Sequence, residues 1–295
     1  MKLLLLTLAA TLALAAPAAA AQDPQLIESD DLSSRLQELT FKTSALAAPT
    51  KVRILLPAGY EPRGKRRYPV LYLLHGASGD QTSWTSAGQG EAEQLTANLP
   101  LIVVMPDGFR GFYTNNTEGP RYAEYIGEEL PAIIERNFPA RSARGARAVG
   151  GLSMGGYGAL RIALGYPDRY TSANSHSGAL MHGSRPTKKP TSSLQDAEWR
   201  RVFGPKPMET DHDLVHLARE CEKAGNLPKI RIDCGTDDFL IEDNRAYHKH
   251  LEALRIDHEY EEFPGVHNWD YWDTHVRTAL AFHAKHLKLK VPTTT

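Results

Sequence analysis

Three reactive side chains follow short apolar stretches of this sequence: a serine, a carboxylate and a histidine, in that order. Ser153 is the centre of Gly151-Leu152-Ser153-Met154-Gly155, a G-x-S-x-G pattern that lies between an apolar stretch and a helix-forming segment. Small residues on either side allow a sharp turn that exposes the serine oxygen. Ordinary glycine-rich turns also carry this pattern, so it predicts a nucleophile only if the chain supplies its partners.

A serine hydroxyl is barely ionised near neutral pH, so it needs a histidine to accept its proton and a carboxylate to hold that histidine. His267 follows one apolar stretch through a glycine-containing turn, and Asp237 and Asp238 follow another. The order serine, acid, histidine is the one expected when such a serine follows a strand of an α/β sheet. His267 is therefore the expected base. The residues alone leave Asp237 and Asp238 as alternatives for the acid.

An oxyanion hole is the remaining requirement, because the carbonyl oxygen gains negative charge when serine attacks. One N–H is expected from Met154, the residue after the nucleophile. The second is expected from Leu73-Leu74-His75-Gly76-Ala77-Ser78-Gly79, where a strand runs into a glycine-rich bend, and we choose Ala77 as its donor. His75 itself is not required to touch substrate.

These residues need a scaffold that brings several strand ends together. Most of the short apolar stretches are continuous rather than alternating in polarity, which is typical of strands buried on both faces of a parallel sheet. Their alternation with helical segments predicts a doubly wound α/β sheet, with reactive groups at the carboxyl ends of the strands. Pro131 should kink or shorten the second helix. The predicted strands are 52–56, 68–74, 101–105, 146–150, 170–175, 229–234 and 258–263, and the predicted helices are 90–97, 121–137, 154–165, 213–224, 242–255 and 268–287.

The organisation along the chain indicates a leader followed by one domain. Lys2 precedes an apolar stretch, and a small-residue segment with an A-x-A exit ends at residue 21, which predicts a secretory signal at 1–21. An uncleaved anchor is the weaker interpretation, because the segment is alanine-rich and only weakly hydrophobic. We therefore expect a secreted or periplasmic domain over 22–295. Residues 182–211 lack periodicity and form an insertion that is either a substrate lid or a surface excursion.

Composition excludes some classes of function. The formal net charge of the 295 residues is -1, so no nucleic-acid partner is expected. The two cysteines, Cys221 and Cys234, either form a disulfide in an oxidising compartment or remain as two buried thiols. His212 and His216 have chelating spacing but no third ligand, so we expect no metal. Five further histidines lie in predicted helices and are interpreted as surface residues: His248, His250, His275, His283 and His286.

Four segments together resemble the putative-esterase family of α/β-hydrolases, which includes S-formylglutathione hydrolase, tributyrin and feruloyl esterases and the antigen 85 mycolyltransferases. The resemblance covers about Lys51 to Leu287. It implies an α/β-hydrolase fold, no cofactor, and a triad of Ser153, Asp238 and His267 with amides of Ala77 and Met154 as the oxyanion hole. The segments are Leu73-Leu74-His75-Gly76, Gly151-Leu152-Ser153-Met154-Gly155-Gly156, Asp233-Cys234-Gly235-Thr236-Asp237-Asp238-Phe239-Leu240 and Gly265-Val266-His267-Asn268-Trp269.

The resulting hypothesis is a serine carboxylesterase that acts on short-chain or carbohydrate-linked acyl esters. A mycolyltransferase-like acyltransferase would use the same triad but pass the acyl group to a sugar. A non-catalytic carbohydrate- or protein-binding module is the alternative from another class, and it would have no need of all three reactive residues. The sequence does not indicate the oligomeric state. Five aromatic residues are candidates either for the substrate pocket or for core packing: Trp84, Phe112, Tyr113, Trp269 and Trp272.

Overall fold

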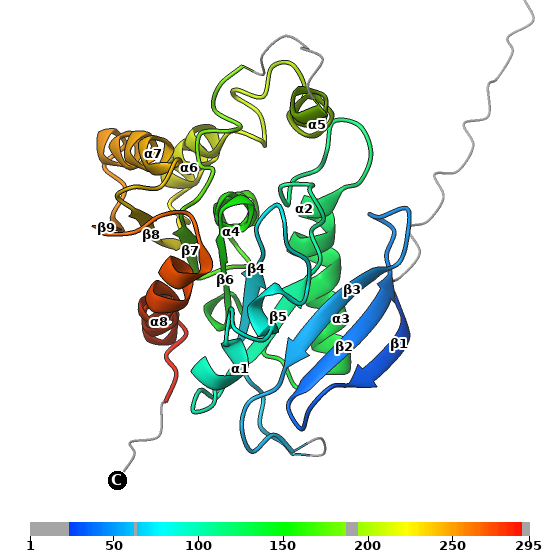
Figure 1. Ribbon diagram of the computed structural model, residues 1–295. Helices are drawn as coiled ribbons and strands as arrows, with labels where there is room; N and C mark the ends of the chain where they lie inside the picture. The colour runs from blue at the N-terminus through cyan, green and yellow to red at the C-terminus, as the bar shows by residue number, and fades with distance from the viewer. Residues whose placement is uncertain (1–23, 62–63, 187–193, 291–295) are drawn as a thin grey trace, which may run out of the picture.

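A computed structural model describes residues 24–61, 64–186 and 194–290, which build one sheet of nine strands in the order β1-β2-β3-β5-β4-β6-β7-β8-β9. Neighbouring strands from β5 to β9 are parallel, and β1, β2 and β3 are added antiparallel at one end (Figure 1). This confirms the predicted α/β-hydrolase fold class. The strands are β1 Gln25–Asp31, β2 Leu36–Lys42, β3 Thr50–Leu55, β4 Val70–Leu74, β5 Ile102–Pro106, β6 Arg147–Leu152, β7 Ser172–His176, β8 Lys229–Gly235 and β9 His258–Phe263.

The seven predicted strands are present, and two strands at the N-terminal end were not predicted. Strands β4, β5 and β6 are buried at every position, as their continuous apolar sequences indicate. Strand β1 is exposed at every position, and β2 mixes buried apolar residues with partly exposed polar ones. Their polar composition explains why the sequence did not predict them, because an antiparallel edge of a sheet does not require an apolar sequence.

Helices cover both faces of the sheet around two separate groups of buried side chains. One group lies under α3, α4, α6 and α7, and the other lies under α1 and α8. The side chain of Asp213 caps the first turn of α6, and the side chain of Asn268 caps the first turn of α8. The α-helices are α1 Ala92–Leu95, α2 Tyr122–Glu124, α3 Leu130–Asn137, α4 Met154–Gly165, α5 Leu194–Phe203, α6 Leu214–Ala224, α7 Ile241–Ala253 and α8 Trp269–His286.

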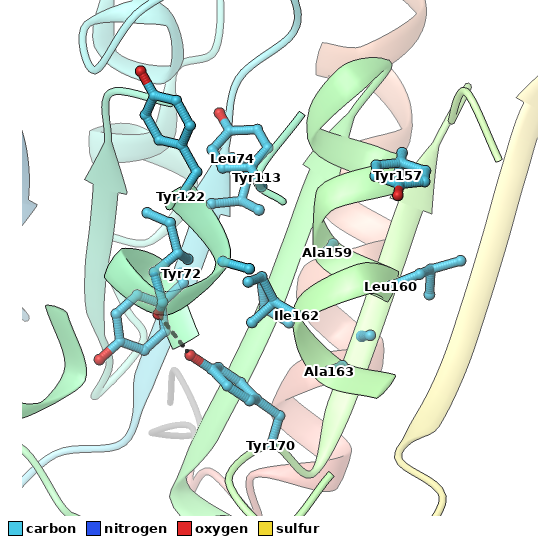
Figure 2. Packing of buried hydrophobic residues seen from close by; sticks show 14 of the residues in the cluster. Tyr72, Leu74, Tyr113, Tyr122, Tyr157, Ala159, Leu160, Ile162, Ala163 and Tyr170 are labelled. Atoms are coloured by element: carbon cyan, nitrogen blue, oxygen red, sulfur yellow. Dashed lines mark hydrogen bonds between the residues drawn. The ribbon is translucent and has the colours of Figure 1, made fainter. Parts of the chain in front are cut away.

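Helix α4 is packed against the centre of the sheet, and all but its last residue are buried. Figure 2 shows Ile162 of this helix beside Tyr72 of β4 and Tyr170, whose rings meet edge to face with centroids 6.0 Å apart. The Tyr170 hydroxyl donates to the carbonyl of Ile126 at 3.1 Å. This packing holds α4 against the sheet, and Ser153 directly precedes the first residue of this helix.

Three helical expectations need correction. The segment predicted at 121–137 is not one kinked helix, because a π-helical stretch, Tyr125–Glu129, separates α2 from α3 just before Pro131. The helix predicted at 90–97 is a single turn. Helix α5 lies inside the segment 182–211 that lacked periodicity, and residues 187–193 of that segment are outside the described residues.

The leader expected at 1–21 also lies outside the described residues. No helix in the described part of the chain is long and apolar enough to cross a membrane. Cys221 in α6 and Cys234 in β8 are free and buried, so the structure favours the two-thiol alternative. Burial raises the pKa of the Cys221 thiol to about 11, which leaves it protonated near neutral pH.

The interpretation of His283 as a surface residue is wrong. Its ring is buried between α8 and β7, where Nδ1 is 2.8 Å from the Ser172 hydroxyl and Nε2 is 2.8 Å from Asn174 Oδ1. Polar residues at alternate positions of β7 point toward α8 and provide these partners. An apolar helix face with one histidine does not reveal such partners in a distant strand.

Burial lowers the pKa of His283 to about 3. The unfolded chain binds a proton near pH 6.5 whereas the folded protein does not, so the free energy of unfolding should fall as pH falls below about 6.5. This residue should contribute about 1.4 kcal/mol per pH unit in that range. Urea unfolding of His283→Gln is expected to show a pH dependence weaker than wild type by that amount. Parallel pH dependences of the two proteins would contradict the buried, uncharged state.

Candidate active site

Ser153 lies in a strained turn between β6 and α4. Its backbone has φ 54° and ψ −118°, a conformation that L-residues rarely adopt and that costs of order 1–3 kcal/mol. A Cβ at Gly151 would lie 2.5 Å from the Gly155 carbonyl oxygen, and one at Gly155 would lie 2.4 Å from the Leu74 carbonyl oxygen. Both glycines are therefore required by close backbone approach, and the turn presents the serine side chain at the end of the sheet.

A chain of hydrogen bonds joins the three reactive side chains that the sequence singled out. Ser153 Oγ lies 2.9 Å from His267 Nε2. On the other side of the ring, His267 Nδ1 lies 2.8 Å from Asp238 Oδ2 and 3.0 Å from Oδ1. Because Nδ1 faces a carboxylate it carries the proton, and Nε2 is left to accept one from the serine.

The two candidate carboxylates occupy different environments. Asp238 is buried, and its Oδ1 also accepts a hydrogen bond from the Leu240 N–H at 2.8 Å. Asp237 is exposed, and its side chain accepts a hydrogen bond from the neighbouring Thr236 hydroxyl at 3.2 Å. The structure therefore brings Asp238, and not Asp237, to His267.

His75 fixes the orientation of the peptide that precedes Ala77. Its Nε2 accepts the Gly108 N–H at 2.9 Å, so its Nδ1 carries the proton and donates to the Gly76 carbonyl at 2.7 Å. The Gly79 N–H also donates to this carbonyl, at 3.0 Å. In a trans peptide the N–H points opposite to the C=O, so the Ala77 N–H points away from these donors.

Met154 is the first residue of α4, so its N–H has no acceptor within the helix. The N-terminal end of a helix also carries partial positive charge. Ala77 and Ser153 both line one cavity, and Met154 follows Ser153 in the chain. The two expected oxyanion-hole donors thus lie on neighbouring backbone segments at one site.

The cavity at Ser153 has a volume of about 540 Å³ and is lined by two chemically different groups of residues. Phe239, Trp269 and Trp272 form an aromatic wall beside His267. The Phe239 ring lies 4.4 Å from the His267 ring, and the Trp272 ring meets it edge to face at 4.9 Å. The second group consists of small or polar residues: Ser78, Gly79, Ser83 and Gln89.

Among the aromatic candidates, only Trp269 and Trp272 line this cavity. Trp84, Phe112 and Tyr113 are core residues.

His212 Nδ1 lies 2.9 Å from the Thr114 hydroxyl, and among the described residues no group of three histidine, cysteine or acidic side chains is placed to hold a metal.

The family model described as "Putative esterase" matches residues 43–283. The chain belongs to this family. It is 31% identical over 264 residues to an acetyl esterase of Caldicellulosiruptor saccharolyticus, covering 85% of this chain and 98% of the relative. It is 42% identical over 272 residues to esterase Rv1288 of Mycobacterium tuberculosis, covering 82% of this chain and 58% of that protein, so it spans little more than half of that relative.

Among solved structures, the esterase resembles FphF, a fluorophosphonate-binding serine hydrolase of Staphylococcus aureus. The TM-score is 0.73 at 25% identity, and the match covers 84% of this chain and 97% of the other. Together with the family match, this similarity shows that the protein is a carboxylic ester hydrolase. The resemblance inferred from the four sequence segments is thereby confirmed.

Two residues of the site were not assigned a role from the sequence. Phe239 lies in one of the four segments but has no role predicted from the sequence; it is 76% exposed and its ring lies against His267. The sequence does not require His75 to touch substrate, and it predicts no other role for this residue; in the structure His75 holds the peptide between Gly76 and Ala77. The only sequence signal for this role of His75 is its position next to a glycine at a strand end. Its partner Gly108 is 33 residues away in the chain, so local sequence does not reveal the contact.

A proton shared between His267 Nδ1 and Asp238 should give a downfield proton NMR signal. Asp238→Asn should abolish this signal because the amide is a weaker acceptor than the carboxylate. Asp237→Asn is the matched control, and it should leave the signal in place because this carboxylate is exposed and turned away from the ring. Loss of the signal in Asp237→Asn alone would reverse the assignment.

Proposed function

We propose that the esterase is a serine carboxylesterase in which Ser153 is the nucleophile, His267 the general base and Asp238 the carboxylate that orients the histidine. The observation that carries this proposal is the continuous chain of hydrogen bonds from Ser153 Oγ through both nitrogens of His267 to Asp238. A buried carboxylate that accepts the Nδ1 proton fixes the tautomer in which Nε2 is basic.

The reaction proceeds by acylation and deacylation. His267 Nε2 takes the Ser153 hydroxyl proton while Oγ forms a bond to the ester carbonyl carbon, and Asp238 stabilises the imidazolium that results. The tetrahedral intermediate collapses, the C–O bond to the alcohol breaks, and the leaving alkoxide receives the proton from His267. Water then attacks the acyl-enzyme with the same base, and the acid and free Ser153 are released.

The oxyanion is proposed to bind the amides of Ala77 and Met154. The Gly76 carbonyl is held from the opposite side by His75 and by the Gly79 N–H, which supports an inward direction for the Ala77 N–H. Donors fixed before the reaction need no reorganisation when charge develops, and each is worth about 3 kcal/mol in the transition state.

We infer that the substrate is a short acyl ester of a hydroxyl-bearing alcohol, such as a carbohydrate. The lining of the cavity supports this inference, because its aromatic residues suit an apolar face and Ser78, Ser83 and Gln89 suit hydroxyl groups. The name of the acetyl esterase relative also favours a short acyl group. The leader expected at 1–21 would place the enzyme with esters outside the cytoplasm.

Ser153→Ala should lower kcat for p-nitrophenyl acetate by at least about 10³-fold, because no other group replaces the nucleophile. The same variant should lose covalent labelling by a fluorophosphonate probe. Circular dichroism and thermal unfolding will show whether the variant is folded. Turnover close to wild type in a folded Ser153→Ala protein would disprove the proposed mechanism.

Phe239→Ala should raise KM for p-nitrophenyl acetate by about 3- to 10-fold, since an aromatic contact contributes roughly 0.5–1.5 kcal/mol. The KM for ethyl acetate should change little, because this ester has no ring to stack. Val266→Ala is the matched control, an exposed apolar residue beside His267 that does not line the cavity. An equal rise in KM for both esters would contradict a stacking role for Phe239.

A further inference from the structure

A second histidine–aspartate pair lies inside the sheet, one residue row below Ser153. His176 Nδ1 is 2.8 Å from Asp233 Oδ2 and 2.9 Å from Oδ1, and both side chains are fully buried. The Tyr271 hydroxyl donates to Asp233 Oδ1 at 3.1 Å. Burial raises the pKa of Tyr271, so its hydroxyl remains a donor. None of these three residues lines the cavity at Ser153.

The group contacts the ends of all three strands that lead to the triad. On the serine side, the Ser153 N–H donates to the His176 carbonyl at 2.9 Å, and Leu152 is the register partner of His176. The Ser153 carbonyl in turn accepts the Ala179 N–H at 3.3 Å. The last residue of β7 and the segment that follows it therefore hold both the N–H and the carbonyl of Ser153.

On the acid side, Asp233 is the register partner of His176 and lies in β8, the strand that leads to Asp238. Its backbone carbonyl accepts the Ser177 N–H at 2.8 Å. Side-chain and backbone bonds thus join β7 to β8 at the last residue of β7, two residues before β8 ends. A slip between these strands would move Ser153 relative to Asp238.

On the base side, Tyr271 packs against the turn that precedes His267. A Cβ at Gly265 would lie 2.6 Å from Tyr271 Cδ2, so this turn passes directly over the tyrosine ring. The Tyr271 N–H is also capped by the side chain of Asn268, the residue after His267, at 3.1 Å. The tyrosine that binds Asp233 thereby fixes the histidine loop.

Such a group is costly to bury. His176 Nε2 is inaccessible and has no hydrogen-bond partner among the described residues. An apolar set of the same shape would avoid this cost, so the polar group calls for an explanation other than stability. We propose that His176, Asp233 and Tyr271 are positioning residues that hold the nucleophile, acid and base loops in catalytic register. This inference rests on the proposed role of Ser153 and deepens it.

The test compares kcat, KM and the rate of fluorophosphonate labelling across four variants. His176→Gln removes the donor at the Nδ1 position, and kcat should fall by about 10²-fold with KM within about twofold, since misplacement of order 1 Å has that effect. His176→Asn puts an amide N–H near that position and should recover most of the loss. Tyr271→Phe keeps the ring on Gly265 and should lower kcat by about 10-fold. Labelling rates should fall in parallel with kcat.

His283→Gln is the matched control. It makes the same substitution in a buried histidine that also bonds β7, but at Ser172 and Asn174, away from the strand end. We expect a lower Tm with kcat within about twofold of wild type. Equal kcat losses in His176→Gln and His283→Gln, or no recovery in His176→Asn, would overturn the positioning role.

Ser153→Ala, assayed in parallel, separates this inference from the proposed function. An active Ser153→Ala variant would mean that the proposed nucleophile is wrong, and the positioning role would fail with it. An inactive Ser153→Ala variant together with full kcat in folded His176→Gln would overturn the positioning role alone.

Discussion

The structure depends on one close backbone contact, the approach of the first turn of α4 to the end of β4. Gly155 passes so near the Leu74 carbonyl that no side chain fits between them, and Ser153 is forced to a positive φ. The cost of this conformation is offset by the burial of α4 along nearly its whole length and by the bonds to Ser153 N–H and C=O from the β7 segment. The same contact places the N-terminal end of α4 beside the glycine-rich bend after β4. The proposed nucleophile and the proposed oxyanion donors are thus positioned by a single packing constraint.

Hydrogen bonds within the site divide into those that hold side chains and those that hold peptides. Asp238 orients His267, and the Leu240 N–H orients Asp238. His75 plays the corresponding part for the peptide between Gly76 and Ala77. The two orienting side chains, Asp238 and His75, are buried, so water does not compete for their partners and their bonds are stronger than on the surface. The exposed part of the site, by contrast, is the aromatic wall at Phe239, where substrate is expected to replace solvent.

The sequence predicted the centre of the fold well because buried parallel strands carry continuous apolar sequences and their ends lie at one edge. That rule was enough to bring Ser153, His267 and one of two adjacent aspartates to one place. It failed at β1 and β2, where an antiparallel edge tolerates polar residues, and at α5, whose segment shows no apolar period. It also failed for His283, because burial of a polar residue depends on partners in a distant strand. The choice between Asp237 and Asp238 needed the family resemblance, because two adjacent aspartates just after one strand both satisfy the rule.

Polar residues at alternate positions of β7 show why local sequence rules miss part of the site. Ser172, Asn174 and His176 face α8, and each finds its partner on another element: His283 for the first two and Asp233 for the third. Alternating polar residues of this kind are typical of a strand with one exposed face, yet every residue of β7 is buried. An apolar face would bind α8 with less demand on geometry, because dispersion contacts tolerate small slips and hydrogen bonds do not. Hydrogen bonds between strands are therefore most useful where the strand register must be exact. In this sheet that position is the row of residues next to Ser153.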